Sequence, residues 1–568
     1  MTSTLENEAK EANTLKNGQP RPVKVELFSP ERRRPPKKAG MEQHFGPTDP
    51  KVDALKLPVI GKPLTKLFKS RPFQFMMILP NQAIFWIVII GGIVGGSYAM
   101  PTGENNFGTV ITWFIWFCLI FIMIVGVGRA WCMMCPFGGF AEWVQRHTFW
   151  KRTIKPITAN WKWPEKMAKF GILPAVGTFI FLTWIEEFFN IAGPGYPIFT
   201  SLMVLGIVAT ALTVMLLFER RTFCRYLCPL TGLIGSAGAT GMVAGFRTRD
   251  RDKCLSCQTK DCMRGSENGY GCPWFEWPGS ASSNLMCGLC TECMKNCPED
   301  NVGLFLQPPL TSVIKPDRRR TDVGVAIVAL LGLVVFQQFN ALSPYQSLDT
   351  WLNSHTGFQF GAYGYPNPID YLGIIALASL VPVLLTGVIT LLLAKKTTSQ
   401  VTDTRDSGPR VVPSSGGVAL LEAPAAIQTT KTVKTSQFKT WFVALAYGII
   451  PLMASDYLAR QLPKFLSNSP RIIAAISDPF DKGWNLFGTA KLHIANQHIL
   501  LGNGVVAVQI VVVGIGLLAS LYATNKIVKN ELVQISKNAL ATRAITLLYV
   551  LALGLTVAGL YYPMHAAF

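Results

Sequence analysis

The chain has 568 residues, of which 49% are hydrophobic and only 15% are charged, whereas soluble domains carry roughly 25% charged residues. This composition excludes an ordinary soluble globular protein and indicates an integral membrane protein. The formal net charge is +20 at pH 7, which in a membrane protein serves orientation and contact with anionic lipid headgroups. Because no basic face is interleaved with base-stacking aromatic residues, we expect no nucleic-acid partner.

The first segment, residues 1–71, is polar and rich in Lys, Arg and Pro, as in "ERRRPPKKAG" at 31–40. It contains no early apolar core of the kind that a signal peptide needs. We therefore expect a disordered, basic tail on the cytoplasmic side.

Nine apolar runs of about 20 residues follow, and each predicts a helix that crosses the roughly 30 Å bilayer core. The runs are 79–99, 109–128, 169–189, 198–218, 323–342, 370–394, 438–456, 505–524 and 543–563. The seventh run ends early, at "ASDYLARQ". The expected fold class is an all-α polytopic membrane protein with a small α+β insert.

The number of Lys and Arg residues alternates between low and high from one loop to the next. The loop 100–108 has none, the loop 129–167 has seven, and the loop 190–197 again has none. This pattern predicts a cytoplasmic N-terminus and an outer C-terminus in a bacterial or archaeal cytoplasmic membrane. The loop 457–504, which carries several basic residues, fits the scheme least well.

Polar stretches divide the chain into parts. A four-helix membrane core is expected at 72–248, an insert at 249–310, two further membrane helices at 320–396, and three more with an outer loop at 438–568. Residues 397–437 are rich in Thr, Ser, Val and Ala and include "DSGPRVVPSSGG". We expect a flexible cytoplasmic linker there.

Eight of the 13 cysteines lie in the insert. The stretch "CGLCTECMKNCPEDNVG" at 287–303 has the C-x2-C-x2-C-x3-C-P spacing of bacterial ferredoxins, in which the fourth cysteine ligates the other cluster. The upstream cysteines are looser and end in "GCPW". Crossed ligation predicts two [4Fe–4S] clusters. The first takes Cys254, Cys257, Cys262 and Cys297, and the second takes Cys272, Cys287, Cys290 and Cys293.

Other chemistry fits the eight cysteines less well. Zinc would leave two thiolates of the second set unused. Disulfides are disfavoured because the segment is expected in the reducing cytoplasm.

Four more cysteines lie in two similar motifs, "RAWCMMCPFGGF" at 129–140 and "RTFCRYLCPLTGLI" at 221–234. Each motif follows a pair of predicted membrane helices, which makes an internal repeat of about 92 residues. A pseudo-twofold axis along the membrane normal would bring the four thiols together. The predicted third thiolate centre, either Fe–S or a mononuclear metal, comprises Cys132, Cys135, Cys224 and Cys228.

Alternatives remain open for these motifs. Two separate pairs would serve as redox thiols or copper(I) sites, and a structural role needs no metal. Arg129 and Arg221 either stabilise thiolate charge or anchor the helices at the membrane surface. The remaining Cys118 lies in an apolar run and is expected to be a packing residue.

The two Cys-Pro motifs together with the eight-cysteine segment resemble the NapH/NosR/CcoG-type polyferredoxin-like 4Fe-4S membrane proteins, over about residues 75–310. The resemblance implies quinol-linked or cytoplasmic electron transfer, which feeds respiratory reductases of nitrogen metabolism, or metal handling for oxidase assembly. The chain departs from the family pattern in three respects. The first motif is C-x2-C-P, we expect no outer flavin domain, and the last three helices have no counterpart.

Two further pairs of residues are candidates for chemistry. Glu186 and Glu187 in "TWIEEFFN" could accept quinol protons, or they mark a polar helix boundary. His493 and His498 in "KLHIANQH" could form an outer metal, haem or docking site, or they are ordinary loop residues. No C-x-x-C-H occurs, so we expect no covalent haem.

The sequence thus predicts a membrane-bound iron–sulfur protein that relays electrons between the quinone pool and a partner redox protein. That partner is a cytoplasmic ferredoxin-like protein or an outer cytochrome or reductase. We expect a subunit of a respiratory oxidoreductase and no stand-alone enzyme. The alternatives are a copper-reducing assembly factor and a redox-sensing membrane anchor or transporter.

Overall fold

The computed structural model describes most of the chain from residue 52 onward. The described residues are 52–95, 106–147, 156–192, 197–281, 284–314, 319–340, 342–356, 368–394, 401–405, 411–412, 420–421, 427–431, 437–492, 498–533, 536 and 538–562. Residues 1–51 of the expected tail lie outside them.

Each of the nine predicted apolar runs contains a helix within its described residues. They correspond to α3 (Phe73–Gly95), α4 (Phe107–Thr109) with η6 (Val110–Trp116) and α5 (Phe117–Val127), α9 (Leu173–Phe188), α10 (Pro197–Leu217), α16 (Thr321–Phe339), α18 (Pro368–Leu393), α19 (Gln437–Gly448) with α20 (Ile450–Asn468), α22 (Asn503–Ile527) and α23 (Ala539–Tyr561). Within the described residues, eight helices are long and apolar enough to cross a membrane. The ninth, α9, has 16 residues and is shorter than the roughly 20 that a span needs.

Shorter helices connect these. They are η4 (Ala54–Lys56), α2 (Gly61–Lys69), η7 (Gly128–Ala130), α6 (Trp131–Met134), α7 (Pro136–Arg146), α8 (Glu165–Ala168), η8 (Phe223–Leu227), α11 (Pro229–Gly238), α12 (Arg251–Ser256), α13 (Asp261–Arg264), α14 (Glu292–Lys295), α15 (Thr311–Ile314), α17 (Ser343–Thr356), η9 (Ser469–Arg471), α21 (Ile472–Ser477) and η11 (Val528–Leu532).

The outermost helices expose apolar side chains. Leu384 of α18 is 63% exposed, Leu518 of α22 is 69% exposed and Leu548 of α23 is 63% exposed. A helix that is apolar all round and exposed on one side fits a lipid environment. The surface of the bundle is therefore compatible with a multi-pass membrane protein.

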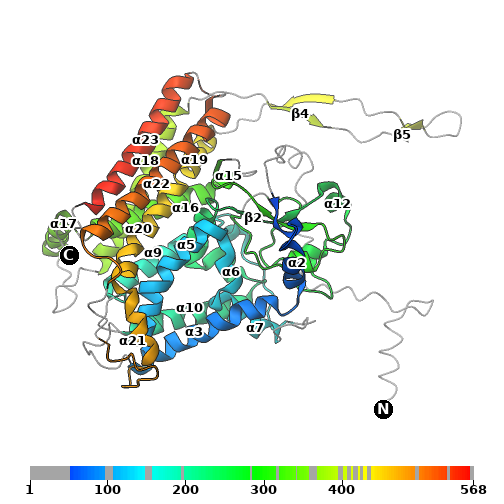
Figure 1. Ribbon diagram of the computed structural model, residues 1–568. Helices are drawn as coiled ribbons and strands as arrows, with labels where there is room; N and C mark the ends of the chain where they lie inside the picture. Colours follow the sequence, from blue (N-terminus) through cyan, green and yellow to red (C-terminus); the bar gives the residue numbers. More distant parts are fainter. Residues whose placement is uncertain are drawn as a thin grey trace, which may run out of the picture.

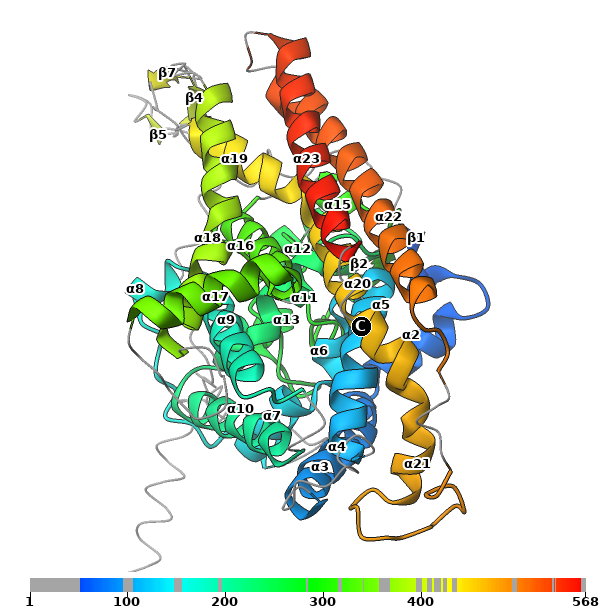
Figure 2. The same cartoon turned by 90° about the vertical axis from the view of Figure 1, so that its left-hand side faces the viewer.

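Helix α20 lies at the centre of the bundle and not at its edge. Its Tyr457 stacks on Phe121 of α5 with ring centroids 5.6 Å apart, and its hydroxyl donates to the Leu330 carbonyl of α16 at 3.0 Å. Figure 2 shows α19, α20 and α21 one after another along this part of the bundle. The last three membrane helices therefore share one core with α5, α9, α16 and α18, although the sequence separates them by a polar segment.

The seventh helical run does not end at "ASDYLARQ", as the sequence indicated. The chain bends at Ile449 and continues as α20 to Asn468. Asp456 is fully buried and accepts hydrogen bonds from Gln338 and Tyr561. Because these partners replace water, the polar residues do not break the helix. Arg460 and Lys464, expected in a loop, belong to this helix.

A small antiparallel sheet with strand order β1-β3-β2 supports the cysteine-rich segment. Its strands are β1 (Val52–Asp53), β2 (Val243–Thr248) and β3 (Val302–Leu306). In register, Val52 pairs with Leu306, and Thr248 pairs with Val302. Figure 1 shows β2, α2 and α12 together on one side of the helical bundle.

Residues 52–70 correct the expectation of a disordered tail. They form β1, η4 and α2, and Leu55 packs in one apolar cluster with Cys262 and Cys293. Asp53 pairs with Arg249 at 2.7 Å, and Lys69 pairs with Asp300 at 2.8 Å. The end of the polar segment is therefore part of the cysteine-rich domain.

The segment expected to be a flexible linker includes described backbone pairing. The strands are β4 (Val401–Arg405), β5 (Val411–Val412), β6 (Leu420–Leu421) and β7 (Ile427–Lys431). β4 pairs with β7 and β5 pairs with β6, both antiparallel. This differs from the expectation, and the residues between these strands lie outside the described part of the chain.

Candidate metal centres and adjoining cavity

The two Cys-Pro motifs fold into the same local structure. Cys135 has φ −65° and ψ 124°, Cys228 has φ −59° and ψ 121°, and each precedes a helix that begins with proline. Proline suits this first helical position because its φ is already helical and its missing N–H would have no partner. Each cysteine therefore lies at the N-terminus of a helix, where free N–H groups favour a thiolate.

The structure brings the cysteines of the two motifs together, and we call Cys132, Cys135, Cys224 and Cys228 the tetrad. A Cβ on Gly138 in the first repeat would lie 3.0 Å from the Cys224 Sγ in the second. The pKa of Cys228 is raised to about 11, first by burial and then by the nearby Cys132. Burial also raises the pKa of Cys224, which has all three other members as neighbours.

The four cysteines of the first predicted cluster line one small pocket. Asn301 links the two distant parts of the chain there. Its amide donates to the Cys254 Sγ at 3.5 Å, and its backbone N–H donates to the Cys297 Sγ at 3.2 Å. The pKa of Cys262 is raised to about 12, first by burial and then by Cys297, Cys254 and Cys257. The remote Cys297 thus lies with Cys254, Cys257 and Cys262, as crossed ligation requires. We call these four cysteines the outer group.

The other four cysteines, Cys272, Cys287, Cys290 and Cys293, form the middle group. Burial raises the pKa of Cys272, and the nearby Cys290 and Cys287 raise it further. Burial raises the pKa of Cys293, with Cys272, Cys287 and Cys290 as its nearest charged neighbours. The remote Cys272 therefore joins the second set. Gly245 makes room for this set: its φ is +98°, and a Cβ would lie 3.3 Å from the Cys287 Sγ.

The three groups lie in a row. Cys262 of the outer group also raises the pKa of Cys293 in the middle group. On the other side, Arg221 interacts with both Cys224 of the tetrad and Cys290 of the middle group. Trp274 packs in one apolar cluster with Cys224 and Cys272. The order is outer group, middle group, tetrad.

Two buried arginines accompany the tetrad. Arg129 is 0% exposed and Arg221 is 1% exposed, so neither is a surface anchor. Arg129 donates to the Leu285 carbonyl at 2.7 Å and lies 4.4 Å from the Trp274 ring centroid. No carboxylate among the described residues pairs with it. A buried cation without a carboxylate partner is costly unless other negative charge lies nearby, and the thiolates of a bound cluster would supply that charge.

One buried carboxylate in this region, Glu142, was not among the residues expected from the sequence. Glu142 accepts two hydrogen bonds from Arg221, at 3.0 and 2.5 Å, and pairs with Arg146 one turn along α7. Arg221 in turn donates to the Cys132 carbonyl at 3.1 Å. The i,i+4 spacing of Glu142 and Arg146 was the available signal, but it did not indicate burial. Glu142 holds Arg221 against the tetrad.

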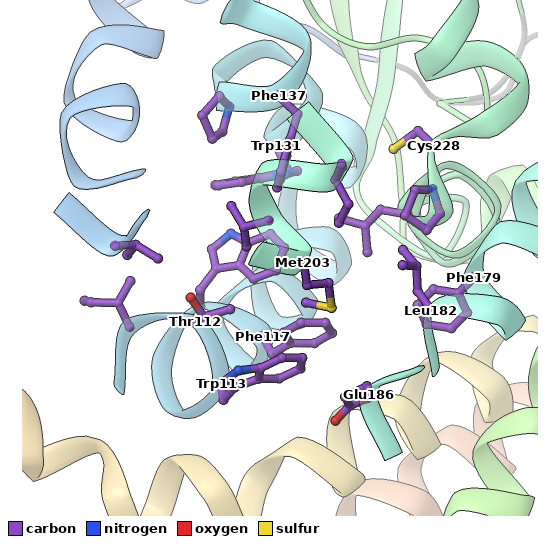
Figure 3. A pocket seen from close by; sticks show the side chains of 18 of the residues that line it. Thr112, Trp113, Phe117, Trp131, Phe137, Phe179, Leu182, Glu186, Met203 and Cys228 are labelled. Carbon is purple, nitrogen blue, oxygen red and sulfur yellow. The ribbon is translucent and has the colours of Figure 1, made fainter. Parts of the chain in front are cut away.

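A cavity, here called the central cavity, begins at the tetrad and runs into the bundle. Its empty volume, open mouth included, is about 1340 Å³. Figure 3 shows Cys228, Trp131 and Phe137 toward one end and Glu186, Trp113 and Phe117 toward the other. Most of its lining is aromatic or aliphatic.

Polar side chains gather at the far end of the central cavity. Arg460 and Lys464 of α20 line it beside Glu186. Lys464 lies 3.9 Å from Glu186, and Arg460 lies 2.7 Å from Glu187. Glu187 also accepts from Gln337 at 3.1 Å. The two glutamates are therefore paired with α20, and neither is a plain polar boundary.

The candidate histidine pair is only half described. His493 lies outside the described residues. The ring of His498 forms a hydrogen bond with the Ser467 carbonyl at 2.8 Å. An outer metal, haem or docking site at these two residues therefore stays a prediction.

The chemistry of the three groups fits iron–sulfur clusters. Each offers four clustered cysteines, and four such thiolates would need a bound cation to offset their burial and their mutual repulsion. Among the described residues, no group of three or more His, Cys, Asp or Glu side chains is arranged to hold a single metal ion.

Comparison with known proteins identifies a 4Fe-4S binding domain in two segments of the chain, residues 109–156 and 200–238. These segments contain the two Cys-Pro motifs and therefore all four cysteines of the tetrad. The eight cysteines of the outer and middle groups lie beyond both segments. No curated protein and no solved structure matches the chain. The match supports an iron–sulfur, ferredoxin-like protein.

Proposed function

We propose that this chain is a membrane-bound iron–sulfur protein that relays electrons between a quinone in the central cavity and a partner redox protein. The main support for the proposal is that one cavity extends from Cys228 at one end to Glu186 and Lys464 at the other. A quinone needs an apolar slot for its ring and a few polar groups for its oxygens. This cavity offers both beside a thiolate centre.

The three cysteine groups are proposed to hold three [4Fe–4S] clusters. When bound, such clusters supply one-electron carriers, here in the order tetrad, middle group, outer group. For the tetrad, the proposal is supported by the 4Fe-4S match at its two motifs. For the other two groups it is supported by ferredoxin spacing and by the crossed arrangement around Asn301 and Cys272.

Quinol is the proposed donor. Its oxidation to quinone releases two electrons, which pass to the tetrad end of the cavity, and two protons. Buried positive charge raises a cluster's reduction potential because it stabilises the added electron, and Arg129 and Arg221 supply that charge beside the tetrad. Glu186 is placed to accept a proton at its carboxylate, and Lys464 orients that carboxylate.

The outer group is the proposed exit toward the partner. Cys257 and Cys297 are only partly buried and adjoin the exposed Gln258 and Pro298, whereas Cys287 is the one partly buried cysteine of the middle group. A soluble redox protein needs close access to one cluster edge. The loop charges support a cytoplasmic position for this group, in a bacterial or archaeal cytoplasmic membrane, as part of a respiratory electron-transfer complex.

The test uses the purified full-length protein in liposomes under anaerobic conditions. A quinol analogue without an isoprenoid tail is added, and cluster reduction is followed by electron paramagnetic resonance. We expect reduction in the wild type and at least a roughly hundredfold slower rate in Glu186→Gln, since a positioned base contributes about that much.

Glu165→Gln is the control, because it removes the same charge at an exposed position that does not line the cavity within the described structure. Its rate should stay close to that of the wild type. Clusters that dithionite reduces but quinol does not would contradict the proposal.

A further inference from the structure

A second cavity, here called the lateral cavity, lies beside the central cavity between α9 and α10. Its empty volume, open mouth included, is about 1010 Å³. Five residues line both cavities: Leu182, Met203, Ile207, Phe223 and Pro229. The two spaces are therefore separated by no more than one layer of shared side chains.

The lateral cavity offers nothing polar to a ligand. Its only side-chain hydroxyls belong to Thr178 and Thr210, among the described residues that line it. Each hydroxyl donates within its own helix, to the Pro174 carbonyl at 3.0 Å and to the Gly206 carbonyl at 2.8 Å. No charged residue lines the cavity. A hydrocarbon chain is the occupant that such a wall favours.

The lateral cavity also reaches the lipid-facing surface. Three of its lining residues are large, apolar and half exposed: Phe181 at 50%, Phe189 at 48% and Leu202 at 50%. In a membrane-spanning bundle these side chains face lipid tails. A path therefore leads from the membrane, between α9 and α10, to the central cavity.

We infer that the lateral cavity is the entry path and binding site for the isoprenoid tail of the quinol whose ring occupies the central cavity. This inference rests on the proposed function. An acyl chain of a phospholipid is the other hydrocarbon at hand, but its phosphate would need a cation, and the lining described here supplies none. The quinol oxygens, in contrast, find Glu186, Arg460 and Lys464 at the end of the adjoining space.

Gly206 allows a direct test. It lines the lateral cavity but not the central one, and a Cβ there would have no atom within 4 Å. Gly206→Trp therefore fills the lateral cavity without a clash in the helix itself. Gly177→Trp is the matched control, because Gly177 in α9 also has open space around its Cβ and lines neither described cavity.

The experiment compares two quinols in liposomes, one with a long isoprenoid tail and one without a tail. We expect Gly206→Trp to slow cluster reduction by the long-tailed quinol at least about tenfold, as loss of apolar tail contacts predicts. Reduction by the tail-less quinol should stay within about twofold of the wild type. The control should leave both rates unchanged.

The inference would be overturned if Gly206→Trp changed the rates of both quinols by the same factor relative to the wild type. This holds whether both rates are slowed or both are unaffected. A phospholipid retained by the purified wild type and lost in Gly206→Trp, with both quinol rates unaffected, would assign the cavity to an acyl chain. If neither quinol reduces the wild type, the proposed function itself fails. The failure of the inference and the failure of the function are therefore distinguishable.

Discussion

Gly138 and Cys224 come from different repeats of the chain, and a Cβ on Gly138 would lie only 3.0 Å from the Cys224 Sγ. This close approach is the point at which the two Cys-Pro motifs meet. A branched side chain at position 138 must displace the sulfur, because cores of this kind have little free space.

We therefore expect Gly138→Val to lose the tetrad's cluster while the other two clusters remain. Iron content and electron paramagnetic resonance spectra measure this directly. Gly126→Val is the matched control, since Gly126 lies in α5 with no atom within 4 Å of its Cβ position. A Gly138→Val protein with an unchanged complement of clusters would contradict a joint site.

Asn301 contacts sulfurs of the outer group from two directions, through its amide to Cys254 and through its backbone to Cys297. Hydrogen bonds to ligand sulfurs raise a cluster's reduction potential. We expect Asn301→Ala to lower the potential of one cluster by roughly 30–60 mV, which corresponds to about 1 kcal/mol per electron. Redox titration measures this, with the other two clusters as internal controls. A uniform shift in all three would argue against a local contact.

Glu142 is the carboxylate partner of the buried Arg221. Its replacement by Gln leaves buried positive charge without a counter-charge, which costs about 3–5 kcal/mol. We expect Glu142→Gln to lower the thermal stability of the purified protein markedly. The exposed Glu165 provides the control, because Glu165→Gln changes the same charge at the surface. Similar stability of the two variants would mean that the Glu142–Arg221 pair contributes little.

The outer group should be the first to lose its cluster on exposure to oxygen. Cys257 and Cys297 are partly exposed and adjoin the exposed Gln258 and Pro298 in the chain, whereas the partly exposed cysteines of the other two groups have no exposed residue next to them. Oxidation of cysteine sites follows exposure. Spectra taken during slow oxidation should show one cluster disappearing before the others. Asn301→Ala should shift the signal that disappears first. Simultaneous loss of all clusters would contradict the proposed order.

The apolar runs and the cysteine spacing predicted much of this structure. All nine runs contain a helix within their described residues, because about 20 consecutive apolar residues leave a chain in lipid few alternatives. The crossed positions of Cys272 and Cys297 agree with the ferredoxin pattern. The meeting of the two Cys-Pro motifs agrees with the internal repeat. In each case a pattern within a short stretch of sequence was enough to predict the structural feature.

Other features depend on contacts between distant residues and could not be predicted in this way. Asp456 and Arg460 seemed to end a helix, yet Gln338, Tyr561 and Glu187 supply their hydrogen bonds and ion pair from other helices. Residues 52–70 looked like a polar tail, but they add a strand to a sheet whose other strands lie some 200 residues later. The central cavity likewise arises only when α9 and α20 lie together.

The central claim is a row of three iron–sulfur centres that ends at the quinone cavity. The most direct measurement is iron and sulfide content, together with a redox titration, for the wild type and for the Cys132→Ser, Cys224→Ser double variant. The account predicts about twelve irons in the wild type, about four fewer in the variant, and loss of the centre that quinol reduces first. Equal iron content and identical spectra in the two proteins would contradict it, and copper bound at the tetrad in place of iron would favour a metal-handling role.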